Sequence, residues 1–346
     1  MKEKNFRGVD VVVGGGYGDE GKGQISSYLA RKRDYSIILR ISSPQAGHSI
    51  VNNCKKIALT TLPCGSVTNK NSRILLGAGS LVYVPKLLKE LNETGLVGSE
   101  RFGIDHRASI VTNIHLAEEK GNQNLMTVVG SVGAGAGPCR RDRLMRMENF
   151  LLARDLPELK PYLTDVVKEI YSTLQRQGKI LLEGDHGFQL SLIHGEYPTV
   201  TSRDTTAMGF LSEAGINPFS VRNVYLCLKP YATRVGNGRL EEELTDEDIL
   251  SWAHEKGGEI GSVSGRKRRI GMFEYENVRR AMIVNGATDI AITHMDIFQN
   301  PELIKFFGTE EDFLNKIERK ICSEYPFPQI SLLSYGLDLG DVKELK

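Results

Sequence analysis

The 346-residue chain has 40% hydrophobic and 25% charged residues, an ordinary composition for a globular protein with a large core. Its formal net charge is +1, so it lacks the general basic surface that binds nucleic acid. No apolar run is long enough to cross a bilayer, and residues 1–7 lack the apolar segment of a secretion signal. The five cysteines are scattered without a Cys-x-x-Cys spacing, which indicates a reducing compartment. We therefore expect a cytoplasmic protein that binds neither nucleic acid nor membranes.

A β-branched run at residues 9–13 ends in a glycine-rich stretch, and an apolar helix pattern begins soon after it. Strand, loop and helix in this order place backbone N–H groups and Lys22 at a helix N-terminus, which favours anions. Residues 16–22 match the phosphate-loop spacing Gly-x-x-x-x-Gly-Lys, but Gly23 stands where a Ser or Thr would hold Mg²⁺. The loop also contains two carboxylates, Asp19 and Glu20. Negative charge beside a phosphate calls for a bridging metal or a proton-transfer role.

Strand and helix patterns alternate along the rest of the chain. Strands are predicted at residues 36–41, 72–79, 179–182, 224–229 and 289–296, and helices at residues 25–30, 85–92, 244–254 and 276–285. Another amphipathic helix is predicted to begin at Pro161, with Leu163, Val166, Val167, Ile170 and Leu174 on its buried face. This alternation predicts an α/β fold with a mostly parallel central sheet, helices on both faces and a first strand–helix turn like a phosphate loop. We expect residues 1–346 to form a single domain with loop and helical sub-regions.

Five polar loops are predicted at strand ends, at residues 14–23, 42–49, 130–138, 183–187 and 293–296. The carboxyl ends of parallel strands meet at one edge of the sheet, where ligands bind. Asp19 and His48 are a candidate base and acid there, unless His48 is a turn histidine at the surface. Asp296 could accept two N–H donors of a guanine, or it could cap a helix. The pair Arg266 and Arg268 could clamp a carboxylate.

These features favour a Mg²⁺- and nucleotide-dependent enzyme that acts on an anionic substrate. A switch GTPase fits less well, because it needs the hydroxyl that is missing at Gly23. It would also leave the Arg-rich and Gly-rich loops unexplained.

Five motifs occur in the order seen in adenylosuccinate synthetases, and the chain resembles that family over roughly residues 8–340. The motifs are Gly18-Asp19-Glu20-Gly21-Lys22-Gly23, Ala46-Gly47-His48-Ser49, Tyr197-Pro198 with Thr201-Ser202, Thr233-Arg234-Val235-Gly236, and Ser264-Gly265-Arg266-Lys267-Arg268-Arg269. The first motif is highly specific to the family. The short length resembles the archaeal and viral forms more than the longer bacterial ones.

The resemblance implies a ligase of purine nucleotide biosynthesis that joins L-aspartate to IMP with GTP and Mg²⁺, by way of a phosphorylated 6-oxygen. Asp19 would take the N1 proton of the purine, while His48 and Lys22 would stabilise the phosphoryl charge. Asp19 and the Gly47 carbonyl would hold the metal. GTP and its phosphates would contact Gly18, Glu20, Gly21, Gly23, Ser49 and Asp296. The acceptor nucleotide would contact Gln45, Ser131, Arg146, His186, Thr201 and Val235, and aspartate would contact Ser264, Arg266 and Arg268. Arg146 would act across the interface of a homodimer.

The chain departs from the family pattern at four places. Gln45 stands for the usual Asn, Ser131-Val132 for a Thr pair, Asp185-His186 for a small residue followed by Gln, and Met272 for Trp. Most of these sites would face the acceptor nucleotide or aspartate, where a lost hydrogen bond costs about 0.5–1.5 kcal/mol. Two alternatives therefore stay open. One is the same ligation on dGMP, which certain viral relatives use on the route to 2-aminoadenine DNA, and the other is a GTP-binding regulator without catalysis. The presence of Asp19 and Asp296 favours IMP and GTP.

Overall fold

A ten-stranded sheet forms the centre of the computed structural model, which describes residues 6–52, 55–255, 258–261 and 264–345. Its strand order is β16-β15-β14-β11-β1-β10-β2-β5-β7-β9, and every neighbouring pair is parallel except β15 and β16. The strands are β1 (Val9–Gly14), β2 (Ile37–Arg40), β5 (Arg73–Leu76), β7 (Phe102–Asp105), β9 (Leu163–Thr164), β10 (Ile180–Glu183), β11 (Val221–Leu228), β14 (Asp289–Ile292), β15 (Gln329–Ser334) and β16 (Val342–Glu344). The predicted α/β fold with a mostly parallel sheet is confirmed.

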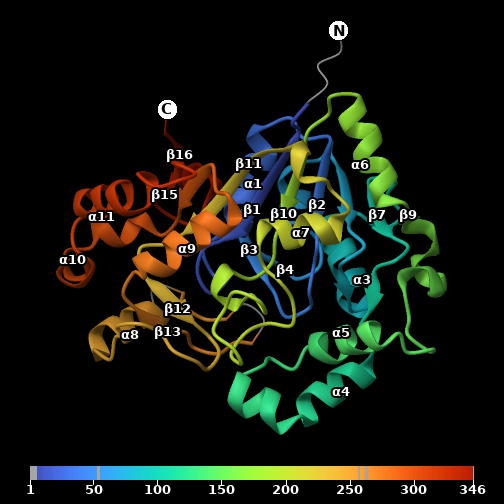
Figure 1. Cartoon of the computed structure of the whole chain (residues 1–346), viewed down its shortest axis with the longest axis horizontal. Helices are drawn as coiled ribbons and strands as arrows, with labels where there is room; N and C mark the ends of the chain where they lie inside the picture. The colour runs from blue at the N-terminus through green and yellow to red at the C-terminus, as the bar shows by residue number, and fades with distance from the viewer. Residues whose placement is uncertain (1–5, 53–54, 256–257, 262–263, 346) are drawn as a thin grey trace.

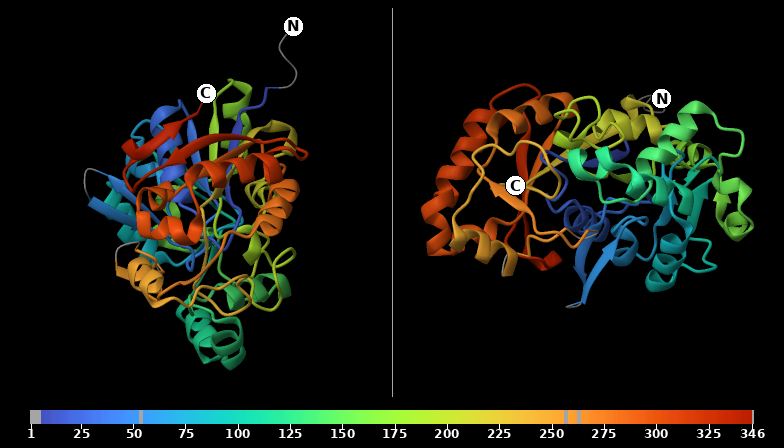
Figure 2. Two further views of the ribbon diagram at one scale, coloured as in Figure 1. Left: turned by 90° about the vertical axis from the view of Figure 1, so that its left-hand side faces the viewer. Right: turned by 90° about the horizontal axis from the view of Figure 1, so that it is seen from below.

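Helices cover both faces of this sheet (Figures 1 and 2). Within the central strand β1, Val11 and Val13 join one core cluster and Val12 joins the other, because successive side chains point to opposite faces. The first cluster also takes the buried sides of α6 (Val166–Gln175), α7 (Ala207–Ala214) and α9 (Tyr275–Asn285). The second takes those of α1 (Lys22–Lys32) and α3 (Val84–Thr94). The predicted helices on both faces are thereby confirmed.

Smaller elements surround the carboxyl ends of the strands and lie below the sheet in Figure 1. They include the hairpin of β3 (His48–Asn52) and β4 (Lys55–Leu59), the pair β12 (Ala232–Arg234) and β13 (Arg269–Gly271), and the helices α4 (Asn113–Gly121), α5 (Ala136–Met145) and α8 (Glu247–Glu255). The remaining elements are α2 (Gly65–Thr68), β6 (Leu81–Val82), β8 (Ser109–Ile110), α10 (Pro301–Phe307) and α11 (Glu310–Ile317).

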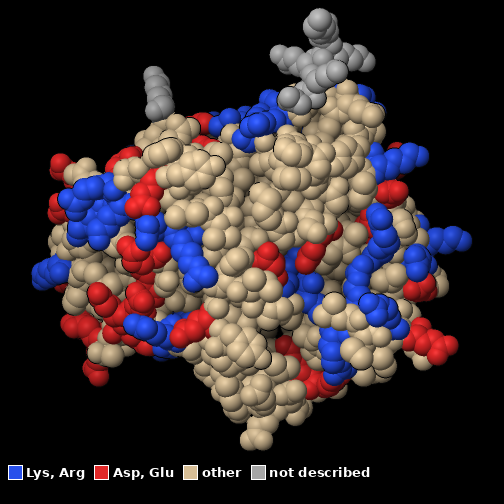
Figure 3. Space-filling model, viewed as in Figure 1, with Lys and Arg blue, Asp and Glu red and all other residues tan. Residues whose placement is uncertain are grey.

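The surface carries both signs of charge. Lysine and arginine side chains are intermixed with aspartate and glutamate on the face shown in Figure 3. Among the described residues, no helix is long and apolar enough to cross a membrane. The four cysteines described, Cys64, Cys139, Cys227 and Cys322, are buried and free, and Cys54 lies outside the described residues.

The helix predicted to open at Pro161 begins later. Pro161 lies in a short 3₁₀ helix (Pro157–Tyr162), Leu163 belongs to β9, and α6 begins at Val166. Asp165 is the N-cap of α6, because its carboxylate accepts a hydrogen bond from the backbone N–H of Lys168 at 3.1 Å. A capping aspartate thus starts this helix, and the proline ahead of it does not.

Three other boundaries differ from the prediction. The strand expected at residues 289–296 ends at Ile292, and Asp296 lies in the 3₁₀ helix Met295–Gln299. The loop at residues 130–138 follows the π-helical turn Asn124–Val129 instead of a strand. The loop at 42–49 is shorter than expected, since His48 and Ser49 already belong to β3.

Candidate functional site

A cavity of about 370 Å³ opens beside the carboxyl ends of the central strands. Twelve of the predicted site residues line it: Gly18, Asp19, Gln45, Gly47, His48, Ser131, His186, Thr201, Val235, Ser264, Arg266 and Arg268. The other predicted residues lie outside this lining: Glu20, Gly21, Lys22, Gly23, Ser49, Arg146 and Asp296. Segments that are far apart in the sequence therefore meet at the edge where a parallel sheet binds ligands.

The glycine-rich loop joins β1 to α1, as predicted, and a side chain of the loop itself occupies its anion-binding groups. The Glu20 carboxylate accepts hydrogen bonds from the backbone N–H groups of Gly16 at 3.0 Å and Gly18 at 2.7 Å. Lys22 Nζ lies 2.9 Å from the same carboxylate and also donates to the Gly18 carbonyl at 3.0 Å. Lys22 is 1% exposed, so its ammonium is held inside the loop and does not reach the cavity.

Close packing explains the glycine that breaks the phosphate-loop pattern. A Cβ atom on Gly23 would lie 3.0 Å from Cys64 Sγ, 3.0 Å from His48 Cβ and 3.1 Å from the Ser49 carbonyl. The hairpin strand β3 therefore packs where a Ser or Thr side chain would stand. The same strand places His48 beside Gly23, at the position where a phosphate loop usually has its metal-binding hydroxyl.

The two carboxylate oxygens of Asp19 have different surroundings. Its Oδ2 accepts a hydrogen bond from Thr233 and forms ion pairs with Arg268 Nε at 3.1 Å and Lys229 Nζ at 3.6 Å. Its Oδ1 is buried and has no hydrogen-bond partner among the described residues. Buried polar atoms are normally paired, so this oxygen is available to a ligand, a proton or a metal ion.

A second carboxylate, Glu259, holds the cations beside Asp19. It lies 2.9 Å from Lys229 Nζ and 2.6 Å from Arg268 Nη1, and it accepts a hydrogen bond from the Tyr231 hydroxyl at 2.6 Å. Burial alone would raise the pKa of Glu259, but Lys229 and Arg268 lower it, so the carboxylate is ionised. The sequence analysis missed both Glu259 and Lys229, and no spacing pattern links them to the phosphate loop.

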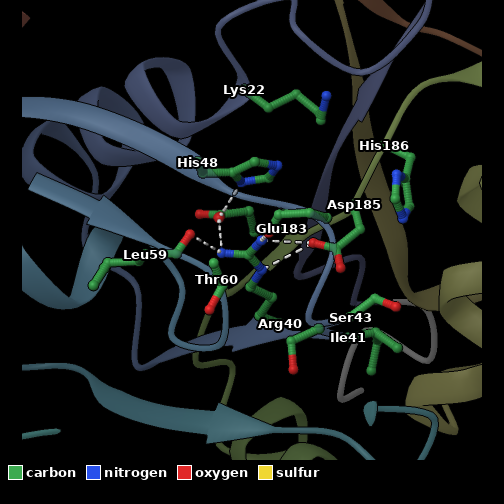
Figure 4. A network of polar contacts seen from close by, with 12 residues as sticks. Lys22, Arg40, Ile41, Ser43, His48, Leu59, Thr60, Glu183, Asp185 and His186 are labelled. Atoms are coloured by element: carbon green, nitrogen blue, oxygen red, sulfur yellow. Dashed lines mark hydrogen bonds and ion pairs between the residues drawn. The ribbon is translucent and has the colours of Figure 1, made fainter. Parts of the chain in front are cut away.

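His48 faces the cavity with a carboxylate behind it (Figure 4). Its Nδ1 lies 2.7 Å from Glu183 Oε1, and its Nε2 is buried without a partner among the described residues. Burial and then Arg40 lower the pKa of His48, although the bond to Glu183 opposes them. His48 is therefore a neutral ring whose Nδ1–H donates to Glu183, and it is not a surface histidine.

A buried arginine completes this cluster. Arg40 lies 3.3 Å from Glu183 and donates two hydrogen bonds to one oxygen of Asp185, at 2.9 and 2.7 Å (Figure 4). Burial would raise the pKa of Glu183, but His48 and Arg40 lower it, so Glu183 is ionised. Asp185, which departs from the family pattern, therefore has a partner that offsets its charge. The sequence analysis placed Glu183 in a polar strand-end cluster but assigned it no role, and it missed Arg40.

The unusual residues His186 and Gln45 meet at one wall of the cavity. Gln45 donates to Thr201 Oγ1 at 3.3 Å, and His186 Nε2 lies 3.5 Å from the same hydroxyl. His186 has a left-handed backbone (φ 57°), and a Cβ on the following Gly187 would lie 2.3 Å from the Gly16 carbonyl. Burial and then Arg203 and Lys22 lower the pKa of His186 strongly, so its ring is neutral and offers one donor and one acceptor.

Another part of the cavity lining joins the Gly-rich loop to the Arg-rich loop. Arg266 donates to the Gly130 carbonyl at 2.8 Å, and the next residue, Ser131, donates to the Glu119 carboxylate. Arg266, Arg268 and Ser264 all line the cavity, so the predicted aspartate-binding residues are brought together. Residues 262–263 of the same predicted turn lie outside the described residues.

Two predicted residues lie on the surface, outside the cavity lining. Arg146 follows the last turn of α5 with a left-handed backbone (φ 55°) and an exposed side chain. Asp296 is also exposed. Within one chain, neither residue lines the cavity with the others.

One group of potential metal ligands lies beside the loop. Atoms of His48, Cys64 and Glu183 lie within 4.8 Å of one another. Burial raises the pKa of the Cys64 thiol well above its usual value, and the other two residues already pair with each other. A neutral thiol and a paired histidine do not suit Mg²⁺, which prefers oxygen ligands. The free oxygen of Asp19 suits it better.

A phosphate loop at the edge of a parallel sheet, next to a cavity with a carboxylate, a histidine and two arginines, defines a nucleotide-dependent enzyme that acts on an anionic substrate. The family model for adenylosuccinate synthetase matches residues 11–153 and 152–309. The adenylosuccinate synthetase of Thermococcus onnurineus is 39% identical over 325 residues, which cover 90% of this chain and 92% of that protein. That of Methanocaldococcus jannaschii is 36% identical over 353 residues, with 100% and 99% covered.

Two solved structures share the fold. Fully ligated adenylosuccinate synthetase from Plasmodium falciparum superposes with a TM-score of 0.86 at 23% identity, covering 98% of this chain and 100% of that one. Succinoaminodeoxyadenylate synthetase of cyanophage S-2L, bound to dGMP and dATP, gives a TM-score of 0.81 at 23% identity, with 98% and 95% covered. The chain belongs to the adenylosuccinate synthetase family, and it is a ligase that forms a carbon–nitrogen bond.

Proposed function

We propose how the cavity residues carry out the reaction of the family, in which aspartate is joined to IMP with GTP to give adenylosuccinate, GDP and phosphate. One observation carries the assignment: Asp19 links the phosphate loop to the Arg-rich loop and keeps one buried oxygen unpartnered. That oxygen lies between the phosphate loop and the Arg-rich loop that we assign to the carboxylates of aspartate.

In the first step, Asp19 Oδ1 takes the N1 proton of hypoxanthine, and the 6-oxygen attacks the γ-phosphorus of GTP while GDP leaves. In the second step, the amine of aspartate attacks C6 while the C6–O bond to phosphate breaks, and the proton lost by the amine goes to the departing phosphate. Removing the N1 proton makes the 6-oxygen a better nucleophile. Oδ2 of Asp19 stays bound to Thr233 and close to Arg268, so only Oδ1 has to move a proton.

His48 acts on the transferring phosphoryl group. Its Nδ1–H is used by Glu183, so its Nε2 can donate only when the ring is protonated. Burial disfavours that state in the empty cavity, but the charge of a bound triphosphate favours it. We infer that His48 gains its proton as GTP and IMP bind and then donates from Nε2 to the phosphoryl oxygens.

The remaining contacts combine the cavity walls with the resemblance to the family. Arg266, Arg268 and Ser264 bind the carboxylates of aspartate, while Lys22 balances the charge of the loop that receives the phosphates. The acceptor nucleotide lies against Gln45, Ser131, His186, Thr201 and Val235. The phosphates of GTP contact Gly18, Glu20, Gly21, Gly23 and Ser49, and Asp296 selects guanine.

Mg²⁺ fits the donor set, because it prefers carboxylate and carbonyl oxygens as ligands, and Asp19 and Gly47 line the same cavity. Those two residues would hold the ion. When bound, it neutralises charge on the GTP phosphates.

We propose a homodimer as the active form. The exposed Arg146 is flanked by Leu144, Met145 and Met147, which are 76%, 68% and 55% exposed. An apolar patch of this kind on α5 suits contact with a second copy, which would carry Arg146 to the acceptor phosphate of its partner. Both core clusters pack on one sheet, which supports a single domain. The buried free thiols support a cytoplasmic location.

The test is a product assay. The protein is incubated with GTP, Mg²⁺ and aspartate plus either IMP or dGMP, and the products are identified by mass. We expect adenylosuccinate from IMP. The succinylated deoxyguanylate product alone would assign the dGMP reaction, for which the unusual His186 and Gln45 are the favourable observation. GTP binding without either product would identify a regulator.

Asp19→Asn tests the central residue of the mechanism. The amide keeps the shape of the side chain but cannot take the N1 proton, so turnover should fall at least about 10²-fold. The variant should retain nucleotide binding, measured by calorimetry. Turnover near that of the wild type would remove Asp19 as the base.

A further inference from the structure

Glu119 is a buried carboxylate in the cavity that the proposed mechanism leaves unused. It lies near the end of α4, which packs against α5 at the lower end of Figure 1. Glu119 is 6% exposed and lines the same cavity as Asp19 and His48. Its Oε1 accepts a hydrogen bond from Ser131, whereas Oε2 is buried and has no partner among the described residues.

The surroundings place Glu119 next to the carboxylate-binding arginines. Ser131, which donates to Glu119, follows Gly130, whose carbonyl accepts a hydrogen bond from Arg266 at 2.8 Å. Arg266 and Glu119 therefore bond to two consecutive residues, Gly130 and Ser131. The guanidinium and the carboxylate are thus tied to adjacent residues of one loop, and both residues line the cavity.

Charge complementarity indicates what the free oxygen binds. The substrates are a nucleoside triphosphate, a nucleoside monophosphate and a dicarboxylate, and each would be repelled by an unpaired carboxylate. A buried acceptor left without a donor is also costly. Among these substrates, only the α-ammonium group of aspartate is cationic.

We propose that Glu119 Oε2 binds the α-amino group of aspartate, while Arg266 and Arg268 bind its carboxylates. The inference rests on the proposed function, because it takes the arginines as the aspartate site. Groups of both signs recognise a zwitterion better than arginines alone. Glu119 therefore selects an amino acid over a dicarboxylic acid without an amine.

The test compares aspartate with succinate, which has both carboxylates and no amine. The variant is Glu119→Gln, which keeps the shape of the side chain and an acceptor for Ser131. The matched control is Glu118→Gln on the same helix, whose exposed carboxylate pairs with Arg141 at the surface. For each protein we would measure the KM for aspartate, the inhibition constant for succinate and the KM for IMP.

In Glu119→Gln, the KM for aspartate should rise about 10- to 100-fold, because a hydrogen bond between two charged groups is lost. The inhibition constant of succinate should stay the same or fall, and the KM for IMP should stay the same. In Glu118→Gln, all three constants should match the wild type. This pattern requires an interaction with the amine, which a merely structural role of Glu119 would not produce.

Three results would overturn the proposal. One is an equal weakening of aspartate and succinate, which indicates a collapsed wall. Another is an unchanged KM for aspartate. The third is a higher KM for IMP with an unchanged KM for 2′-deoxy-IMP, which would assign Oε2 to a ribose hydroxyl. Failure of the proposed function looks different, because the wild type would then form no product from aspartate at all.

Discussion

The buried charge cluster around Glu259 allows a sharp stability prediction. Asp19 and Glu259 balance Lys229 and Arg268, and the cluster therefore has no net charge. Glu259→Gln keeps the shape of the side chain but leaves the cluster with one uncompensated positive charge. The two cations are largely buried, because the side chain of Lys229 is 2% exposed and that of Arg268 is 15% exposed. Removing one partner of a buried pair costs about 3–5 kcal/mol, a large part of a typical unfolding free energy of about 5–15 kcal/mol.

Urea denaturation of the apoenzyme measures this cost, with the midpoint expected to fall at an unchanged slope. The control is Glu243→Gln, in which the lost partner is Arg269 and both side chains are 35% exposed. Solvent screens that surface pair, so the control should lose less than about 1 kcal/mol. If both variants lose the same small amount, the argument that the Glu259 cluster is desolvated is wrong. Arg268 should also be less well positioned in Glu259→Gln, so the KM for aspartate should rise more than the KM for GTP.

Further predictions concern the neutral histidines and the loop. Because the pKa of His48 and of His186 is lowered in the fold, the unfolded chain takes up their protons before the folded chain does as the pH falls below about 6.5. Stability should therefore fall by up to about 1.4 kcal/mol per pH unit for each ring, and a flat denaturation midpoint between pH 6.5 and 5 would contradict this. His186→Gln should raise the preference for IMP over dGMP in the product assay, and an unchanged ratio would remove His186 as a specificity residue. Glu20→Ala removes the acceptor of Lys22 and of two loop N–H groups, so GTP should raise the melting temperature of this variant more than that of the wild type.

The fold could be predicted from local patterns because the sheet is parallel and buried. The strands at residues 9–14 and 180–183 are fully buried and appear in the sequence as short runs that are apolar except for Asp10 and the terminal Glu183. Helix starts were less predictable, since the capping residue decides them. Asp165 accepts from the N–H of Lys168, and this single bond sets the first turn of α6, whereas Pro161 only resembles a first helical residue.

Site residues at the ends of neighbouring strands could be predicted from the sequence. Residues that reach the site from segments distant in the sequence could not. Asp19, His48 and His186 follow strands that neighbour one another in the sheet, so topology alone brings them together. Glu259 and Glu119 lie in segments without a motif, and only packing places Glu119 in the cavity wall and Glu259 beside Arg268. Arg146 is a different case, because its predicted role needs a second copy of the chain.

The fold explains how a phosphate loop can contain two carboxylates, Asp19 and Glu20. From the sequence alone, both would be expected to repel a bound phosphate. Glu20 is offset by Lys22 within the loop, and Asp19 is offset by Arg268 and Lys229 from outside it. Neither carboxylate therefore presents an unbalanced charge to a phosphate at the N-terminus of α1, and the field of that helix end is preserved. In the proposed mechanism, this balance lets Asp19 take a proton beside a triphosphate, and one of the cations that offset it, Arg268, belongs to the loop assigned to aspartate.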